Sequence, residues 1–398
     1  MNLLIFYHVV LIFTAISAGK IDPLLKEAVD NNVETEAIVE FPNIQNQISG
    51  LESMSGDAKM NHLVASLKAL TSTTQAPVVT AADSLNLTTQ QFWIANIVQV
   101  KGLTPEKLID LASIEGDFII RPQHKLSLPP MSQEPVANIT NTVQWGVERI
   151  RAPEIWKYTK GEGIVVGIID SGVNLGHISL TESFTGQWLD PHYSTEKPTD
   201  VLGHGTHVAG IILGRHGVGV APNARWMACR ARGVMPELSQ SFASGNDGPA
   251  CQTVGSPGDN RHVIAVGSTD ETDEVSWFSS RGPSYQYNLK PELSAPGNNI
   301  VSCGTGTYNF VSMSGTSMAA PHVAGAIALL LSANPLLGFG DVYRALTTYV
   351  YQPRLASGDK NCGLPTGADF PNNAYGYGII DVAAAFSYGR ANRPPTAN

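Results

Sequence analysis

Three side chains suited to nucleophilic catalysis occur along the 398-residue chain in the order Asp170, His204, Ser317. Ser317 lies where small residues lead directly into an apolar series that includes Val323, Ala326 and Ile327. This pattern predicts a loop that becomes a buried helix, with Ser317 at its start and Pro321 in its first turn. The free N–H groups and dipole of a helix N-terminus would stabilise an anionic tetrahedral intermediate there. Taken alone, however, the segment is more typical of a serine that caps a core helix.

A serine hydroxyl is a weak nucleophile without a base, so the catalytic interpretation requires a histidine and a carboxylate. Asp170 ends the continuous apolar run 164–169, which predicts a central parallel strand. His204 stands at the entry to a second small-residue helix, within Gly-His-Gly-Thr-His-Val-Ala-Gly. Taken singly, Asp170 could instead be a cap after a strand, and His204 could form a metal pair with His207.

Together these segments resemble the subtilisin family of serine peptidases, in which Asp, His and Ser follow in this order. The matching motifs are Asp-Ser-Gly at 170–172, His-Gly-Thr-His at 204–207, Ser-Gly-Asn at 244–246 and Gly-Thr-Ser-Met-Ala-Ala-Pro at 315–321. The resemblance implies that Ser317 is the nucleophile, His204 the general base and then acid, and Asp170 the group that orients the imidazole.

The same resemblance assigns two further residues. It implies that Asn246 is the side-chain donor of the oxyanion hole, although a turn residue beside glycines is the alternative. It implies a packing role for His207, and no acidic or cysteine residue lies at a spacing suited to complete a metal site there. We expect no required cofactor; calcium stays open as an alternative, but no acidic cluster of recognisable spacing allows its ligands to be assigned.

The resemblance runs from residue 143 to the end, with motifs most similar to the subgroup around bacillopeptidase F. It implies an α/β fold with a parallel sheet, helices on both faces and a site at the carboxyl ends of the strands. The domain boundaries that we expect are a signal peptide at 1–18, a propeptide at 19–128, a linker and processing region at 129–142, and a catalytic domain at 143–398.

The segment before residue 128 predicts a small α+β unit. We expect strands at 36–41, 92–100 and 117–120 and helices at 59–70 and 105–114, an order that suggests a ferredoxin-like sandwich. Its position before a subtilisin-like half resembles that of the family's propeptide, which acts as chaperone and inhibitor. An unrelated N-terminal binding domain remains the alternative.

Composition and the N-terminus indicate the compartment and the partners. The apolar run 3–15, followed by small residues, predicts a signal peptide and secretion. The net charge of −9 without basic clusters argues against nucleic acid, so we expect protein or peptide substrates, no membrane after signal removal, and a monomer. Asn86 and Asn138 begin glycosylation triplets, and four cysteines allow two disulfides in any of three pairings.

One stretch departs from the family pattern. A strand at 224–229 and another at 238–243 are separated by only the eight residues 230–237, whereas a parallel crossover needs a dozen or more. Family members carry a helix, a strand and a substrate-binding edge here, so we infer an internal deletion near 230–238.

Two interpretations of this deletion follow. Either the chain is a shortened form of a secreted endopeptidase, or it is a catalytically impaired subtilase that acts as a binding or regulatory protein. In both cases the sheet must lose a strand, pair antiparallel, or leave a gap with exposed apolar surface and an unpaired edge.

Overall fold

The computed structural model divides the chain into two compact units, residues 1–125 and 126–398. The expected signal peptide lies almost wholly outside the described residues, as do Asn138 and most of the expected processing region. The residues that the structure describes are 18–32, 35–44, 47–54, 56–122, 134–136, 142–191, 193–230, 241–364 and 367–391.

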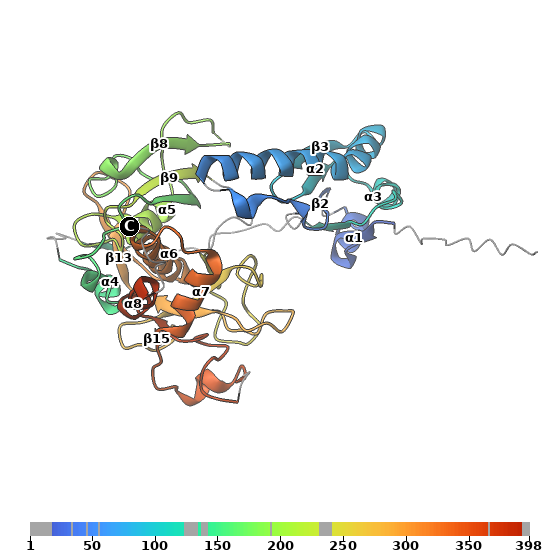
Figure 1. Ribbon diagram of the computed structural model, residues 1–398. Coiled ribbons are helices and arrows are strands. Elements are labelled where there is room, and N and C mark those ends of the chain that lie inside the picture. Colours follow the sequence, from blue (N-terminus) through green and yellow to red (C-terminus); the bar gives the residue numbers. More distant parts are fainter. Residues whose placement is uncertain are drawn as a thin grey trace, which may run out of the picture. The chain divides into compact units, whose positions relative to one another are not determined.

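The first unit is a five-stranded sheet with helices, coloured blue to cyan in Figure 1. Its strand order is β1-β5-β2-β4-β3; β2, β3, β4 and β5 pair antiparallel, and β1 adds to β5 in parallel. Two split β-α-β crossovers connect the four antiparallel strands, which is the ferredoxin-like order that the sequence predicts. The elements are β1 (Lys20–Ile21), α1 (Pro23–Asp30), β2 (Glu36–Glu40), η2 (Leu51–Ser53), α2 (Gly56–Ser84), β3 (Thr88–Phe92), β4 (Ile97–Lys101), α3 (Pro105–Ala112) and β5 (Ile119–Pro122).

Two predictions for this unit were wrong in extent. The helix predicted at 59–70 is the much longer α2, which continues through Pro77 to Ser84. The single strand predicted at 92–100 is a hairpin, because residues 93–96 form a turn between β3 and β4. Asn96 ends that turn at φ 49°, a conformation that Asn adopts more readily than most residues.

The second unit contains the elements of an α/β fold. They are β6 (Glu134–Val136), α4 (Trp145–Arg149), η3 (Ala152–Glu154), β7 (Val165–Asp170), η4 (Thr181–Ser183), β8 (Phe184–Leu189), α5 (His204–Leu213), β9 (Arg225–Arg230), β10 (Ser241–Ala243), β11 (Ile264–Thr269), β12 (Leu293–Pro296), β13 (Ile300–Cys303), β14 (Phe310–Met313), α6 (Thr316–Ala333), α7 (Phe339–Thr348), β15 (Val350–Tyr351), η5 (Ser357–Lys360), β16 (Ile379–Ile380) and α8 (Val382–Ala391).

Parallel strands of this unit form two separate sheets. One has the order β7-β9-β8, and the other the order β10-β11-β12-β16-β15, in which only β15 runs antiparallel. A third, antiparallel sheet joins β13, β14 and β6, so the described part of the expected linker is a paired edge strand. Pro135 suits an edge because it has no N–H to donate.

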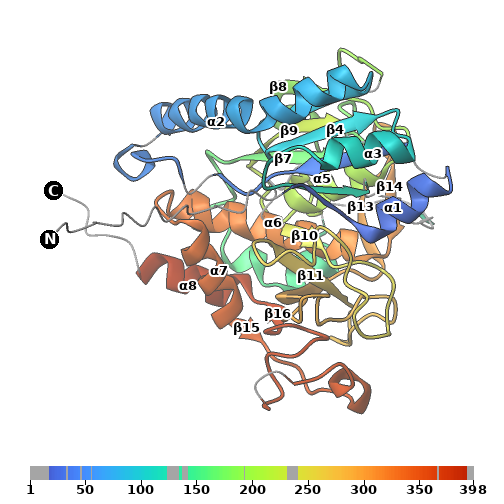
Figure 2. The same cartoon turned by 90° about the vertical axis from the view of Figure 1, so that its right-hand side faces the viewer.

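The core of the unit forms around α6. This helix packs against α5 and against β10, β11 and β12. Figure 2 shows α6 beside α5, β10 and β11. Within the described residues it has the length and apolar composition of a membrane-spanning helix, but 72% of that window is buried inside the protein. We therefore interpret α6 as a core helix.

The β7-β9-β8 sheet has one covered face and one open face. Ile168, Trp226 and Ala228 are buried on the covered side, whereas Val165, Met227 and Leu189 on the other side are 45%, 41% and 60% exposed. The prediction that 164–169 forms a parallel strand is confirmed, but its central position was wrong: among the described strands β7 pairs only with β9 and lies at the edge of its sheet. Its apolar sequence is that of a strand covered on both faces, and none of the described residues supplies the second cover.

The short connection between β9 and β10 is accompanied by an interrupted sheet, as its length predicts. β9 and β10 follow one another along the chain but belong to different sheets, and residues 231–240 between them lie outside the described part. Of the three outcomes expected from the sequence, the structure shows the gap: β7 and β10 are both edge strands, and apolar side chains are exposed beside β7.

The cysteines form one disulfide among the described residues, between Cys251 and Cys362. Cys303 is free and buried, and Cys229 is free and half-buried. The second disulfide that an even number of cysteines allowed is therefore absent from this part of the chain.

Candidate active site

His204 and Asp170 form a buried hydrogen-bonded pair at the end of β7. His204 Nδ1 lies 2.6 Å from Asp170 Oδ1, which also accepts the backbone N–H of Ser171 at 2.6 Å. Because an ionised carboxylate only accepts hydrogen bonds, Nδ1 carries the proton and Nε2 keeps its lone pair. His204 Nε2 is buried and has no hydrogen-bond partner in the described part of the chain. The pair thus leaves one imidazole nitrogen available to accept a proton.

Close backbone packing brings this pair together. His204 is the first residue of α5, and Gly203 before it adopts φ 81°, a conformation that favours glycine. A Cβ on Gly205 would lie 2.1 Å from the Gly172 carbonyl oxygen and 2.8 Å from Asp170 Cβ. Only glycine at 205 therefore lets α5 approach the end of β7 closely enough for His204 to reach Asp170.

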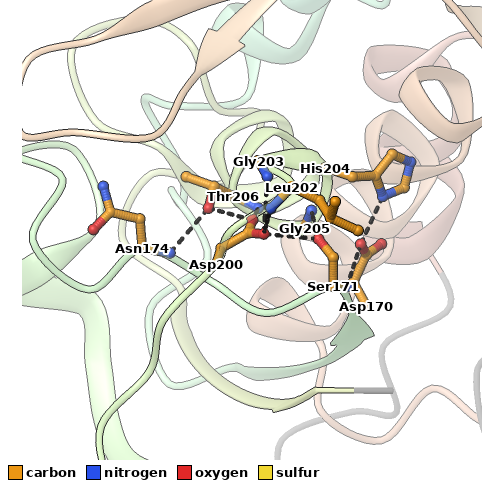
Figure 3. Close-up of polar contacts among 9 residues, drawn as sticks. All are labelled: Asp170, Ser171, Asn174, Asp200, Leu202, Gly203, His204, Gly205 and Thr206. Carbon is orange, nitrogen blue, oxygen red and sulfur yellow. Dashed lines mark hydrogen bonds and ion pairs between the residues drawn. The ribbon is translucent and has the colours of Figure 1, made fainter. Parts of the chain in front are cut away.

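A second carboxylate, Asp200, lies beside the Asp170–His204 pair, on the segment before α5 (Figure 3). Its oxygens accept hydrogen bonds from the Ser171 hydroxyl and from backbone N–H groups of the loop before α5 and of the first turn of α5. Ser171 Oγ in turn accepts the N–H of Gly205 at 3.0 Å. The loop before His204 and the residue after Asp170 are therefore tied to one buried group.

Opposing effects set the pKa of His204. Burial alone would lower this pKa, but the charge and hydrogen bond of Asp170, together with the charge of Asp200, outweigh burial and raise it above the ordinary value. The imidazolium form is therefore stabilised at the position where a general base would receive a proton.

Ser317 is the second residue of α6, so the helix begins where the sequence predicts. Its hydroxyl makes no hydrogen bond to any residue that the structure describes, and its N–H belongs to the first turn, where backbone donors are free. Pro321 lies in the second turn rather than the first as predicted, because the helix starts at Thr316. Proline there removes the donor that would otherwise bond the Ser317 carbonyl.

Asn246 lies beside Ser317, three residues after the end of β10. Its Oδ1 accepts the N–H of Thr316 at 2.9 Å and the Thr316 hydroxyl at 3.0 Å. A backbone N–H can only donate, so this contact fixes the amide orientation and leaves Nδ2 as the free donor. The position of a Cβ on Gly315 would be 3.6 Å from Asn246 Nδ2 and 3.7 Å from Ser317 N. The Asn246 side-chain N–H and the Ser317 backbone N–H therefore both lie close to the position that a side chain at residue 315 would occupy.

The site residues come from both sides of the gap between the two parallel sheets. Asp170 ends β7 in one sheet, and Asn246 follows β10 in the other. Helices α5 and α6, which carry His204 and Ser317, pack against each other, and a Cβ on Gly325 would lie 3.1 Å from the Ile212 carbonyl oxygen. The α5–α6 contact is thus the described link that fixes the base relative to the serine.

His207 is oriented away from the Asp170–His204 pair. It is fully buried, and its Nε2 lies 3.0 Å from the Ile300 carbonyl oxygen and 3.1 Å from that of Val311. Burial lowers the pKa of His207 to about 3, so the ring is neutral and donates from Nε2. Full burial and two backbone carbonyl partners are the surroundings of a side chain packed in the core.

Sequence reasoning did not single out Asp200. The signal available was an acidic residue four positions before His204, on a short loop that ends with Gly203 ahead of the helix. Spacing alone does not distinguish such an Asp from an exposed loop residue. The network appears only when the loop folds back over Ser171.

The fold and the site define a class: α/β proteins in which a hydrogen-bonded Asp–His pair and a serine lie at the starts of two helices that pack against each other. The sequence profile of the Subtilase family matches residues 161–241 and 239–378, which together cover more than half of the chain. The chain therefore belongs to the Subtilase family.

Several characterised relatives are similar over different shares of the chain. Bacillopeptidase F of Bacillus subtilis is 26% identical over 479 residues, covering 93% of this chain but 32% of the relative. Subtilisin-like protease 1 of Trichophyton verrucosum is 30% identical, covering 61% of this chain and 72% of the relative. An intracellular serine protease of Paenibacillus polymyxa is 31% identical, covering 48% of this chain and 73% of the relative. The chain thus spans about a third of bacillopeptidase F.

The alignments also bear on the short connection. A 398-residue chain can fill at most 398 of the 479 positions aligned with bacillopeptidase F, so at least 81 positions (479 − 398) have no counterpart here. The two pieces matched by the family profile overlap at 239–241, at the C-terminal end of the 231–240 stretch. The alignment length shows that the relative has positions without a counterpart here, and the divided profile match indicates a break in the family pattern at 239–241.

Proposed function

We propose that this protein is a secreted serine endopeptidase that cleaves peptide bonds through an acyl-enzyme on Ser317. The observation that carries the proposal is the 2.6 Å contact between His204 Nδ1 and Asp170 Oδ1, which leaves the buried His204 Nε2 without a described partner. Ser317 begins α6, which packs against the helix that His204 begins. Membership in the Subtilase family supports the same assignment.

The proposed chemistry has two half-reactions. Ser317 Oγ attacks the scissile carbonyl carbon while His204 Nε2 takes the hydroxyl proton, and Asp170 stabilises the resulting imidazolium. The carbonyl oxygen becomes anionic and accepts hydrogen bonds from Asn246 Nδ2 and the Ser317 N–H. His204 then protonates the leaving amine, and water, deprotonated by the same imidazole, releases the new carboxylate and restores Ser317. These steps require no cofactor.

The unit at 19–128 is proposed to be the propeptide that inhibits and helps to fold the catalytic half. Two observations support this role. The strand order is ferredoxin-like, and residues 1–125 form a compact unit separate from residues 126–398. Removal of the unit, with processing in the 129–142 region, would release an enzyme that acts as a monomer on proteins and peptides. The apolar N-terminal run and the Cys251–Cys362 disulfide support a secreted product.

A second candidate function rests on the gap between the two parallel sheets. Because Asp170 and Asn246 follow strands on either side of this gap, a poorly fixed gap would leave a triad with little grip on substrate. The chain would then be a binding or regulatory protein derived from an enzyme.

Labelling with a fluorophosphonate probe separates the two functions. The probe forms a covalent bond with a serine only when an adjacent base activates it. We expect one labelled site in the folded, processed protein, and no labelling in the Ser317→Ala and His204→Ala variants. A wild-type protein that is folded and processed but unlabelled would favour the binding function.

A further inference from the structure

Asp200 is the most heavily hydrogen-bonded carboxylate described near the site. Oδ1 accepts the Ser171 hydroxyl at 2.9 Å and the N–H groups of Leu202 and Gly203 at 3.0 and 2.8 Å. Oδ2 accepts the N–H and hydroxyl of Thr206 at 2.9 and 2.6 Å. The side chain is buried, so its negative charge is held by these five donors and not by water.

The donors come from both segments that carry the catalytic pair. Ser171 is the residue after Asp170, whereas Leu202, Gly203 and Thr206 surround His204. Thr206 Oγ1 also accepts the N–H of Asn174 at 2.9 Å, which ties the first turn of α5 to the loop after β7 a second time. Asp200 thus cross-links the Asp170 segment to the His204 segment without touching either side chain.

We propose that Asp200 is a positioning residue for the His204–Asp170 pair. Its function is to hold the first turn of α5 against the end of β7, at the separation at which His204 Nδ1 meets Asp170 Oδ1. As far as it concerns catalysis, this inference rests on the proposed peptidase function. The structural part of the inference, that Asp200 sets the position and the protonation of His204, is independent of that function.

A carboxylate is needed here because all five partners donate. The neutral amide of asparagine has one acceptor oxygen, and its NH₂ group would face either the Oδ1 donors or Thr206. An Asp200→Asn variant therefore leaves buried donors unpaired, which is costly for each group lost. The first turn of α5 would shift away from Asp200, and His204 would move with it.

Charge adds a second effect with a defined sign. The charged groups that act on His204 are Asp170 from β7 and Asp200 from the preceding loop, whereas the nearby His207 on α5 is neutral. Asp200 contributes to raising the pKa of His204 above its ordinary value. Removing its charge should lower that pKa, as should any loosening of the contact with Asp170.

Asp190 provides a matched control on the same sheet. It is a buried carboxylate just after β8, and it accepts the N–H of Tyr193, the N–H and hydroxyl of Thr195, and an ion pair from Arg230. Asp190→Asn should destabilise the protein through a similar loss of acceptor, and the described hydrogen bonds connect Asp190 to the loop before His204 only indirectly, through Arg230 and Thr199. It therefore reports on what a merely structural carboxylate does.

The first test measures the His204 pKa directly by NMR in the full-length chain carrying Ser317→Ala, with the His204 signal assigned by His204→Ala. We expect Asp200→Asn to lower this pKa by about half a unit or more, and Asp190→Asn to leave it unchanged. This readout needs no turnover, so it stands even if the chain proves not to be a peptidase. An unchanged His204 pKa in folded Asp200→Asn would overturn the inference.

The second test uses casein hydrolysis by the processed enzyme. We expect Asp200→Asn to lower kcat by about tenfold or more with little change in KM, and to move the acidic limb of the pH profile downward. Equal losses of kcat in Asp200→Asn and Asp190→Asn, without a shifted limb, would show that Asp200 only stabilises the fold.

A third variant keeps the inference testable if Asp200→Asn does not fold. Thr206→Val removes one donor to Asp200 and the acceptor for Asn174 N–H, whereas Thr206→Ser retains both. We expect Thr206→Val to shift the His204 pKa in the same direction by a smaller amount, and Thr206→Ser to restore it. No difference between the two variants would count against the network.

Discussion

Restoring the segment between Gly233 and Val234 should stabilise the catalytic unit and raise its activity. Val165, Met227 and Leu189 lie about half exposed on the open face of the β7-β9-β8 sheet. Full burial of such a side chain contributes about 1.5–3 kcal/mol, so covering these three exposed halves should contribute about 3 kcal/mol. In a unit of this size that corresponds to a rise in Tm of roughly 6–12 °C.

The experiment compares three chains. One is the natural sequence, one carries the residues of bacillopeptidase F that align at this point, and one carries a Gly/Ser segment of equal length as a control. Melting is measured in a Ser317→Ala background to prevent self-digestion, and casein hydrolysis in the Ser317 background. We expect only the relative's segment to raise both Tm and turnover, since a Gly/Ser chain has no apolar face to cover the sheet.

A substitution on the open face sharpens the test. Met227→Gln should change stability by less than about 0.5 kcal/mol in the natural chain, because the side chain lies at the surface. In the restored chain it should cost about 1–3 kcal/mol, because a buried amide without a partner is penalised. Equal Tm and turnover in all three chains, or an equal cost of Met227→Gln with and without the segment, would refute the reasoning.

Three further predictions concern the catalytic chemistry. Ser317→Ala should abolish hydrolysis and leave the N-terminal unit attached; a purified, protease-free Ser317→Ala preparation that still matures would contradict this. Gly315→Ala should lower kcat by about 100-fold or more while changing Tm little, because the added Cβ meets only ordinary contacts at 3.6–3.7 Å but occupies the space between Asn246 Nδ2 and Ser317 N; calorimetry and kinetics on the same variant separate the two effects. The rate should rise with pH through a value above about 6.5, since only neutral His204 can take a proton and its pKa is raised; a rate that is flat from mildly acidic to mildly alkaline pH would argue against His204 as the base.

The sequence by itself determined the residue types of the candidate site and their order along the chain. The run ending at Asp170, the glycine-flanked His204 and the small-residue entry to the helix at Ser317 are local patterns, and local patterns fix where a strand ends or a helix begins. β7 ends at Asp170, α5 begins at His204, and α6 begins one residue before Ser317. The short 230–237 connection likewise predicted an interrupted sheet, because crossover length is a property of the chain alone.

Tertiary structure decided what depends on contacts between distant segments. Asp200 could not be distinguished from a surface loop residue until the chain folded back to bring Ser171 Oγ within 2.9 Å of it. The pairing of Cys251 with Cys362 needed two loops 111 residues apart to meet, and sequence spacing left three pairings open.

The exposed position of β7 is the clearest case of such a tertiary effect. A continuous apolar run is typical of a strand that is covered on both faces. Whether that cover exists depends on the other segments of the chain. The described residues leave one face open at Val165 and Met227, so a strand with the sequence of a sheet centre lies at a sheet edge.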